Sequence, residues 1–188
     1  MVNPIHQREV LSNAYDDAHP DILTQLQRND QDNYNWCRAV LTTSISRSRL
    51  CRAYVRATYQ AVQHQNDAGN EGAKTNAMRH CVWCGLLTAQ VGFDGAYPFL
   101  LRHENQGQAA DHGPDAPGVA MWRDRRRRYQ AQDGFAESAI DWNNNFVGKS
   151  IGESSDAYIL FGSAVDAVVK KCKAALGSGL LDLRSKEG

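Results

Sequence analysis

The chain has 188 residues, 42% of them hydrophobic, which is enough for one domain with a core of its own. Its 21 basic and 21 acidic residues cancel, which excludes a general electrostatic attraction to nucleic acid or to an anionic membrane. No stretch approaches the roughly 18 consecutive apolar residues of a membrane helix, and the N-terminal "MVNPIHQREV" lacks the layout of a cleavable signal peptide. We therefore expect a single domain without a transmembrane segment.

The first third of the chain has the spacing of helices. Short apolar groups predict two short helices over 4–30, interrupted by "HPD" at 19–21. A longer pattern over about 35–65 predicts one long helix, or two with a bend near Ser46. The polar, glycine-containing "HQNDAGNEGAK" at 64–74 then predicts a loop.

The middle of the chain contains the segment with the most polar chemistry, "NAMRHCVWCGLL" at 76–87. It lies in a predicted helix over about 75–91, with Thr75 or Asn76 as the N-cap and Gly92 as the end. A further helix is predicted from about Pro98, because proline suits the first turn of a helix.

The last third has a loop and two helices. "AADHGPDAPG" at 109–118 has two prolines and two glycines and predicts a loop. "FAESAIDWNNNFVGKSIG" at 135–152 predicts a helix, and a final helix is predicted from a cap at Ser154 or Ser155 to a stop at Gly177. Because no segment alternates like a strand, we expect an all-α, single compact helical domain of about seven to eight helices. The N-terminal helices would occupy 1–70 and a motif-bearing core 75–185 of this 1–188 domain.

The five cysteines suggest reduced thiols rather than a disulfide framework, because their number is odd and the chain is large enough to fold without cross-links. Cys81 and Cys84 form a C-x-x-C pair, but Val82 and Trp83 lie between them in the middle of a helix, unlike a redox motif. We expect both to be small packing residues, with thiol chemistry or zinc binding as the minor alternative.

One face of the 75–91 helix points His80 into the core. Positions three, four, seven and eleven apart lie on the same side of a helix, and here they combine an imidazole with apolar neighbours: His80, Trp83, Cys84, Leu87 and Val91. A buried histidine needs hydrogen-bond partners. Polar residues in two later segments could supply them: His103 and Glu104 in "FLLRHEN", and Asp141, Asn144 and Asn145 in "IDWNNNFVG".

The 135–152 helix has a polar stripe next to glycines. Asp141, Asn145 and Gly148 share a face, with Gly152 one turn further along. Glycines on a helix face allow another backbone to come close, so we expect this stripe to be packed against another helix.

Three segments thus each bring ligand-type side chains together. A divalent metal such as zinc, manganese or iron could bind His80, His103 and Asp141, with Glu104 acting as a base on bound water. The same groups suit metal-free acid–base chemistry on an ester, phosphodiester or glycan. The structural alternative is a satisfied polar network that fixes how the helices pack, without metal or turnover.

The arginine-rich "RDRRRRYQ" at 123–130 is flanked by Trp122 and includes Tyr129. It could bind phosphates, lipid headgroups or an acidic partner, but nearby Asp124, Asp133 and Glu137 favour a solvated helix face. With zero net charge for the chain, binding to nucleic acid is not expected.

The ordered segments "NAMRHCVWCGLLTAQVG", "RHEN" and "IDWNNNFVGKSIG", followed by a late helix, resemble a bacterial domain family found in polymorphic toxins and among proteins delivered by type VI secretion. The resemblance covers about 75–185, and stand-alone effectors of similar size, such as EvpP-like effectors, share the setting. Arg102, Lys149 and Trp142 depart from the family pattern. The family pattern marks these residues of the chain: Arg79, His80, Trp83, His103, Glu104, Asp141, Asn144, Asn145 and Gly148.

The resemblance implies a bacterial effector or toxin, made in the cytoplasm and secreted without a cleavable signal peptide. Its site would hydrolyse a bond in a target cell, with Arg79 holding an anionic substrate group and Asn144 and Asn145 orienting the others. A secretion-apparatus component and an immunity protein are the implied partners. The alternative is an effector that acts only by binding a target protein, with the polar residues purely structural.

Overall fold

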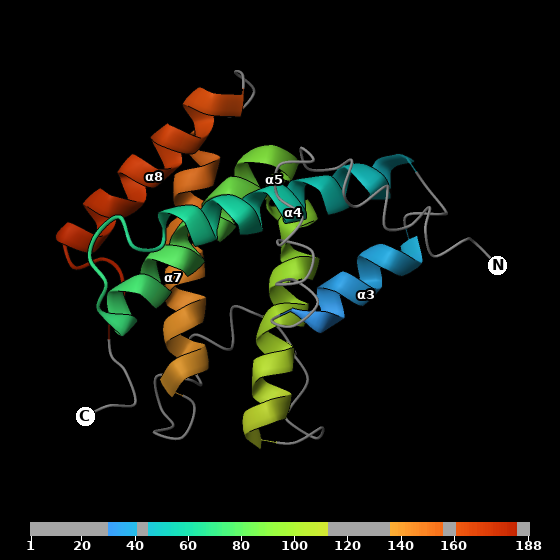
Figure 1. Cartoon of the computed structure of the whole chain (residues 1–188), viewed down its shortest axis with the longest axis horizontal. Helices are drawn as coiled ribbons and strands as arrows, with labels where there is room; N and C mark the ends of the chain where they lie inside the picture. Colours follow the sequence, from blue (N-terminus) through green and yellow to red (C-terminus); the bar gives the residue numbers. More distant parts are fainter. Residues whose placement is uncertain (1–29, 41–44, 113–135, 156–160, 184–188) are drawn as a thin grey trace.

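The structure is a computed structural model that describes residues 30–40, 45–112, 136–155 and 161–183. Within these ranges it contains five helices and no strand, so the all-α prediction is confirmed (Figure 1). The expected total of seven to eight helices stays a prediction. The short helices predicted over 4–30 and the arginine run at 123–130 lie almost entirely outside these ranges. None of the five described helices is long and apolar enough to span a membrane.

Helices α3 (Gln31–Val40) and α4 (Ile45–His64) form the N-terminal part of the fold. Their separation favours the two-helix interpretation of the 35–65 pattern, with the second helix beginning just before Ser46. Tyr54 of α4 is almost completely buried, and its ring stacks on Phe99 with centroids 4.9 Å apart. Trp36 of α3 packs edge-on against the same phenylalanine.

Helix α5 (Gly72–His112) is the centre of the molecule and packs against each of the other four helices. It begins three residues before the predicted cap at Thr75, whose N–H instead donates to the carbonyl of Glu71. Gly92 has φ 73° and ψ 163°, outside the helical region, so the two halves of α5 are steeply inclined to each other (Figure 1). The predicted stop at Gly92 is therefore a kink.

The second half of α5 is longer than predicted in both directions. Its helix is already formed when the chain reaches Pro98, which lies inside α5 rather than in a first turn. It continues through 109–112, where the sequence predicts a loop. Since Ala109 and Ala110 precede the first glycine and proline of that segment, good helix formers extend the helix until Gly113 follows.

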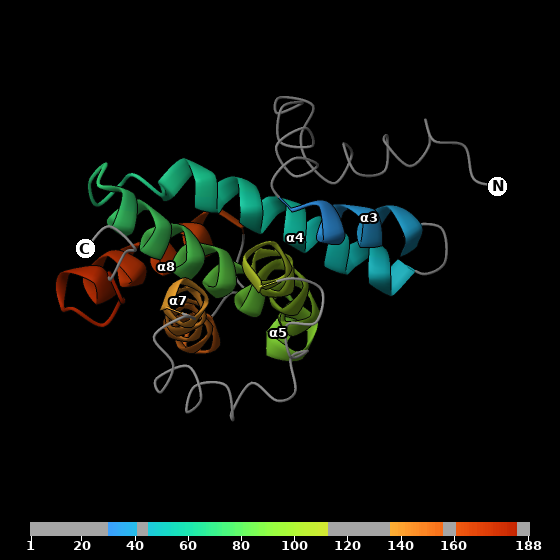
Figure 2. The same ribbon diagram turned by 90° about the horizontal axis from the view of Figure 1, so that it is seen from below.

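Helices α7 (Ala136–Glu153) and α8 (Phe161–Gly177) cover the first half of α5 (Figure 2). The predicted boundaries of α7 and the end of α8 at Gly177 agree with the structure. Ser154 and Ser155 do not cap α8 as predicted. They close α7 instead, where their hydroxyls donate to the carbonyl of Ile151 and Lys171 of α8 donates to both.

The core lies on both sides of α5. Its largest completely or almost completely buried apolar side chains come from α4, both halves of α5 and α8: Tyr54, Val55, Met78, Val82, Leu86, Leu87, Phe99, Leu100 and Val168. Residues 80–88 of α5 are all buried, so the inward face predicted from the spacing is only part of the buried surface of this helix. His80 thus lies in the most enclosed part of the fold.

Candidate functional site

His80, Glu104 and Asn145 form the buried floor of a polar cluster, the name used below for His80, His103, Glu104, Asp141 and Asn145. These three side chains are 3%, 4% and 1% exposed. The amide nitrogen of Asn145 donates to Oε1 of Glu104 at 2.7 Å, and its oxygen lies 3.3 Å from Nδ1 of His80. The same Nδ1 is 3.7 Å from Oε1 of Glu104. One residue of α7 therefore joins the two halves of α5.

Asp141 forms an accessible edge of the polar cluster, and Asn76 connects it to Arg79. Oδ1 of Asp141 lies 3.4 Å from Nε2 of His80 and accepts a 2.6 Å hydrogen bond from the amide of Asn76. The guanidinium of Arg79 donates in turn to the amide oxygen of Asn76 at 2.5 Å. Asp141 is 21% exposed and Arg79 is exposed, so this edge of the cluster is open to solvent.

His103 forms a second accessible edge, on the side of α3 and α4. Its side chain is 31% exposed, and its Nδ1 lies 3.5 Å from Oδ2 of Asp30. The ring packs against those of His80 and Trp83, with centroids 5.6 Å and 5.1 Å away. The two histidines of the sequence prediction are therefore neighbours, although the chain positions they occupy lie on opposite sides of the Gly92 kink.

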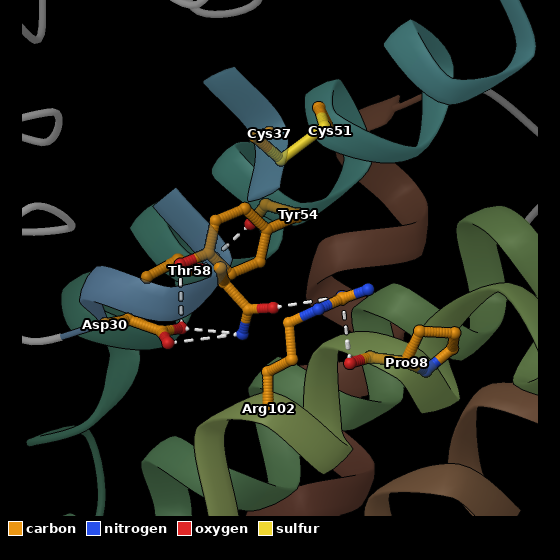
Figure 3. Close-up of a disulfide and its surroundings, with 8 residues drawn as sticks. Asp30, Cys37, Cys51, Tyr54, Thr58, Pro98 and Arg102 are labelled. Carbon is orange, nitrogen blue, oxygen red and sulfur yellow. Dashed lines mark hydrogen bonds between the residues drawn. A yellow bond between two sulfur atoms is a disulfide. The ribbon is translucent and has the colours of Figure 1, made fainter. Parts of the chain in front are cut away.

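Asp30 is held in place by residues that lie outside the predicted site. Oδ2 of this buried carboxylate accepts a 2.7 Å hydrogen bond from the hydroxyl of Tyr54 (Figure 3). Asn33 donates to both carboxylate oxygens and to the carbonyl of Phe99. Arg102 then donates to Asn33 and to the carbonyl of Pro98. These contacts place α3 against α5 and aim Asp30 at His103.

Asn144 is not part of the polar cluster, contrary to the prediction. Its amide nitrogen donates to the carbonyl of Asp182, and its oxygen accepts from the N–H of the same residue at 2.8 Å. Adjacent helix residues point about 100° apart, so Asn144 faces the segment after α8 while Asn145 faces α5. Asn144 anchors the C-terminal segment rather than orienting the site.

The close approach of α7 to α5 rests on glycines, as the polar stripe predicted. A Cβ on Gly148 would collide with the carbonyl oxygen of Cys81, and one on Gly152 would lie 2.5 Å from that of Gly85. Only glycine lets the two backbones come this close. The contact brings Asp141 and Asn145 within reach of His80.

Burial keeps His80 neutral. Desolvation is the largest influence and lowers the pKa of His80 to about 4, although the charge of Asp141 and the hydrogen bond to Asn145 act in the opposite direction. A neutral imidazole has one donor and one acceptor nitrogen. Both ring nitrogens of His80 face acceptor oxygens, so one nitrogen always presents its lone pair to an oxygen.

The pKa of His103 is shifted in the opposite direction. Burial alone would lower its pKa, but the hydrogen bond and charge of Asp30, together with the charge of Glu104, raise it above the usual value. The two neighbouring imidazoles therefore differ in protonation, with His103 the cationic one at mildly acidic pH. Groups whose pKa values are pushed apart in this way are typical of acid–base sites.

The structure brings together a set of potential metal ligands. One ligand atom each from His80, His103 and Glu104 lies within 4.8 Å of the others. The predicted set contained Asp141 instead of Glu104. The kink at Gly92 places Glu104 beside His80 at the bottom of the cluster and leaves Asp141 at its edge.

The cysteines only partly follow the prediction of reduced thiols. Cys37 of α3 and Cys51 of α4 form a disulfide (Figure 3), so that prediction was wrong for these two. Cys81, Cys84 and Cys172 are buried and free. Burial raises the pKa of Cys81 well above its usual value and that of Cys84 to about 12, so neither is a thiolate ready to bind zinc. Both cysteines of the C-x-x-C pair lie in the packed core, as expected.

Comparison with protein-family models adds one finding. The model for a domain of unknown function, DUF6973, matches residues 38–178. The chain belongs to this family. The DUF6973 match includes every residue of the polar cluster, whereas Asp30, Asn33 and Cys37 precede it. Searches of curated proteins and of solved structures found no match.

Proposed function

We propose that this chain is a secreted bacterial effector whose polar cluster binds a divalent metal ion and hydrolyses a bond in a target cell. The observation that carries the proposal is the convergence of ligand atoms from His80, His103 and Glu104 within 4.8 Å. Imidazoles with a carboxylate suit zinc and neighbouring transition metals, and three protein ligands leave a position for water or substrate.

The spacing around His80 fits such an ion. Nδ1 of His80 lies 3.7 Å from Oε1 of Glu104, which is long for a hydrogen bond but close to the spacing of two ligands on one ion. Two atoms that each lie about 2.1 Å from a tetrahedral zinc ion are about 3.4 Å apart. A cation would also provide a partner for the His80 nitrogen whose lone pair faces an acceptor.

The roles of Asn145, Asp141 and Arg79 follow from their positions. Asn145 orients the carboxylate of Glu104 through its 2.7 Å hydrogen bond, as residues behind metal ligands commonly do. Asp141 is accessible and is held by Asn76, so it would act as the general base toward the hydrolytic water in place of Glu104. Arg79, exposed beside Asn76, would hold an anionic group of the substrate.

The cellular setting comes from the resemblance to polymorphic toxins and type VI effectors. A protein of that class would be loaded on a secretion-apparatus component and neutralised in the producing cell by an immunity protein. The Cys37–Cys51 disulfide supports export, because disulfides persist mainly in oxidising compartments.

The non-enzymatic effector is the second candidate, and one observation favours it. His80 and Glu104 are 3% and 4% exposed, and Asn145 contacts both from within the protein. A network of this kind fixes how helices pack without any turnover. The protein would then act by binding a target protein through another surface.

Metal content separates the two candidates. The purified chain, loaded with Zn²⁺ and desalted, is measured by elemental mass spectrometry beside His80→Ala, His103→Ala and the control His64→Ala. His64 is a matched control because it pairs with Asp67 at the end of α4, away from the polar cluster. Near-stoichiometric zinc in the wild type and in His64→Ala, with loss in the other two, supports the metal site. Folded wild-type protein without metal would favour the binding effector.

Turnover is tested in cells. The wild-type chain and His103→Ala are expressed in a bacterial host, once in the cytoplasm and once exported to the periplasm. His103 is chosen because it is partly exposed, so its removal perturbs packing less than removal of His80. Growth inhibition by the wild type alone supports a hydrolytic toxin, whereas equal inhibition by both chains contradicts it.

A further inference from the structure

Three thiols are buried where α5 and α8 pack together, outside the polar cluster. Cys81 and Cys84 of α5 and Cys172 of α8 are each 0% exposed. The Sγ atoms of Cys81 and Cys172 lie 2.6 Å apart, although 91 positions separate them in the chain. Cys84 has a different neighbour, the hydroxyl of Thr88, at 3.9 Å.

The packing of α8 on α5 holds the two sulfurs face to face. One turn away from this pair, Gly85 of α5 lies against Val168 of α8, so closely that a Cβ on Gly85 would be 2.8 Å from Cγ1 of the valine. Cys81 and Gly85 are four residues apart on α5, and their partners Cys172 and Val168 are four residues apart on α8 in the reverse order. The two helices are therefore antiparallel here. Two successive contacts on one seam therefore fix the position of Cys172 over Cys81.

We propose that Cys81 and Cys172 form a second disulfide in the oxidised protein, with Cys84 remaining as the one free thiol. A separation of 2.6 Å leaves little more than half an ångström to the S–S bond length of about 2.05 Å. The Cys37–Cys51 disulfide shows that the folded chain is compatible with an oxidising environment, in which a thiol pair this close is oxidised as well.

The oxidant is a small-molecule disulfide, and the reaction takes place while the chain folds, before the pair is sealed. The thiolate of one cysteine attacks a sulfur of the small disulfide, which gives a mixed disulfide and releases one small thiol. The second cysteine then displaces the other small thiol. The two cysteines lose two electrons and two protons in total, and the small disulfide becomes two thiols.

Counting free thiols tests the proposal. The 188-residue chain is reduced and unfolded, refolded in a buffer of oxidised and reduced glutathione, and then alkylated in denaturant without reductant. Since the chain has five cysteines, two disulfides leave one alkyl group per molecule, and peptide mapping should join Cys81 to Cys172. Three alkyl groups, or a linked peptide that contains Cys84, would overturn the proposal.

Two single variants make the count specific. Cys84→Ser should take up no alkyl group, because its four cysteines are all paired. Cys172→Ser should take up two, on Cys81 and Cys84. If Cys172→Ser fails to fold, Cys84→Ser still decides the question, because two alkyl groups on that variant contradict the Cys81–Cys172 bond.

Discussion

The side-chain amide of Asn145 donates a 2.7 Å hydrogen bond to the buried carboxylate of Glu104 and thereby joins α7 to the far half of α5. This contact matters because a buried carboxylate without a donor is costly. It also places the amide oxygen of the same residue beside His80. The polar cluster is therefore assembled by a residue that would not itself take part in the chemistry.

Replacing Asn145 by alanine tests this role. Since the buried carboxylate of Glu104 loses this donor, we expect the free energy of unfolding to fall by about 1–3 kcal/mol. Chemical denaturation measures the change. Asn143→Ala is the matched control, because that amide is on the same helix and donates a single 3.4 Å hydrogen bond to the carbonyl of Leu180. A loss no larger than that of the control would contradict the role given to Asn145.

A methyl group on the glycine face of α7 should separate α7 from α5. For Gly148→Ala the new Cβ meets the carbonyl of Cys81, so the backbones must move apart, and we expect a loss of about 1–3 kcal/mol. Gly72→Ala is the control, because a Cβ there has nothing within 4 Å. Thermal unfolding compares the two. Equal thermal midpoints would mean that the close approach of α7 is not needed.

The glycine face and the polar cluster illustrate what the sequence could predict. Helical spacing placed His80 on the inward face of its helix and put Asp141, Asn145 and Gly148 on one side of α7, because those relations are local. The same rule puts Asn144 and Asn145 on different faces of α7, but two adjacent asparagines suit a polar site equally well, so the sequence alone does not distinguish them. Local spacing also located the break at Gly92, though not the direction in which the chain continues.

Other features depend on contacts between distant segments and left no local pattern. Tyr54 lies among apolar residues of α4 and has the spacing of a core residue, so its hydrogen bond to Asp30 was not foreseen. Asp30 itself precedes α3 and is brought to His103 only when α3 packs on α5. The Cys37–Cys51 pairing likewise requires the approach of α3 to α4, which cysteine counting cannot supply.

The pKa of His80 should lie below the usual histidine value of about 6.5, and that of His103 should lie above it. Protein freed of metal with a chelator and followed by NMR should show His80 with a pKa near 4 and His103 with a pKa above the usual value. Asp30→Asn should lower the pKa of His103, because the charge that raises it is removed. His103 titrating at or below the usual value in the wild type would contradict the assigned pairing with Asp30.

The stability of the metal-free protein should follow from the same shifts. In the unfolded chain His80 becomes protonated below about pH 6.5, whereas in the folded chain it does so only near pH 4. His80 therefore stabilises the fold above about pH 6.5, and the free energy of unfolding should decrease by about 3 kcal/mol as the pH falls from about 6.5 to about 4. His103 has the opposite sign: its contribution is present at low pH and is lost as the pH rises through its raised pKa. Denaturation of wild type and His80→Gln between pH 4 and 8 should give a shallower acid limb for the variant. Parallel curves would contradict the buried, neutral His80.

The disulfide between Cys37 and Cys51 should hold α3, and with it Asp30, against the polar cluster. It closes a loop with a sequence separation of 14, for which a stabilisation of about 3 kcal/mol is typical. Cys37→Ser/Cys51→Ser should therefore be less stable, and its His103 pKa should move toward that of Asp30→Asn, because α3 no longer holds the carboxylate in place. Cys84→Ser is the control, since Cys84 is a free, buried cysteine beside Thr88 of α5 and outside this contact. A destabilised double variant with an unchanged His103 pKa would mean that the hydrogen bonds of Tyr54 and Asn33 hold Asp30 without the disulfide.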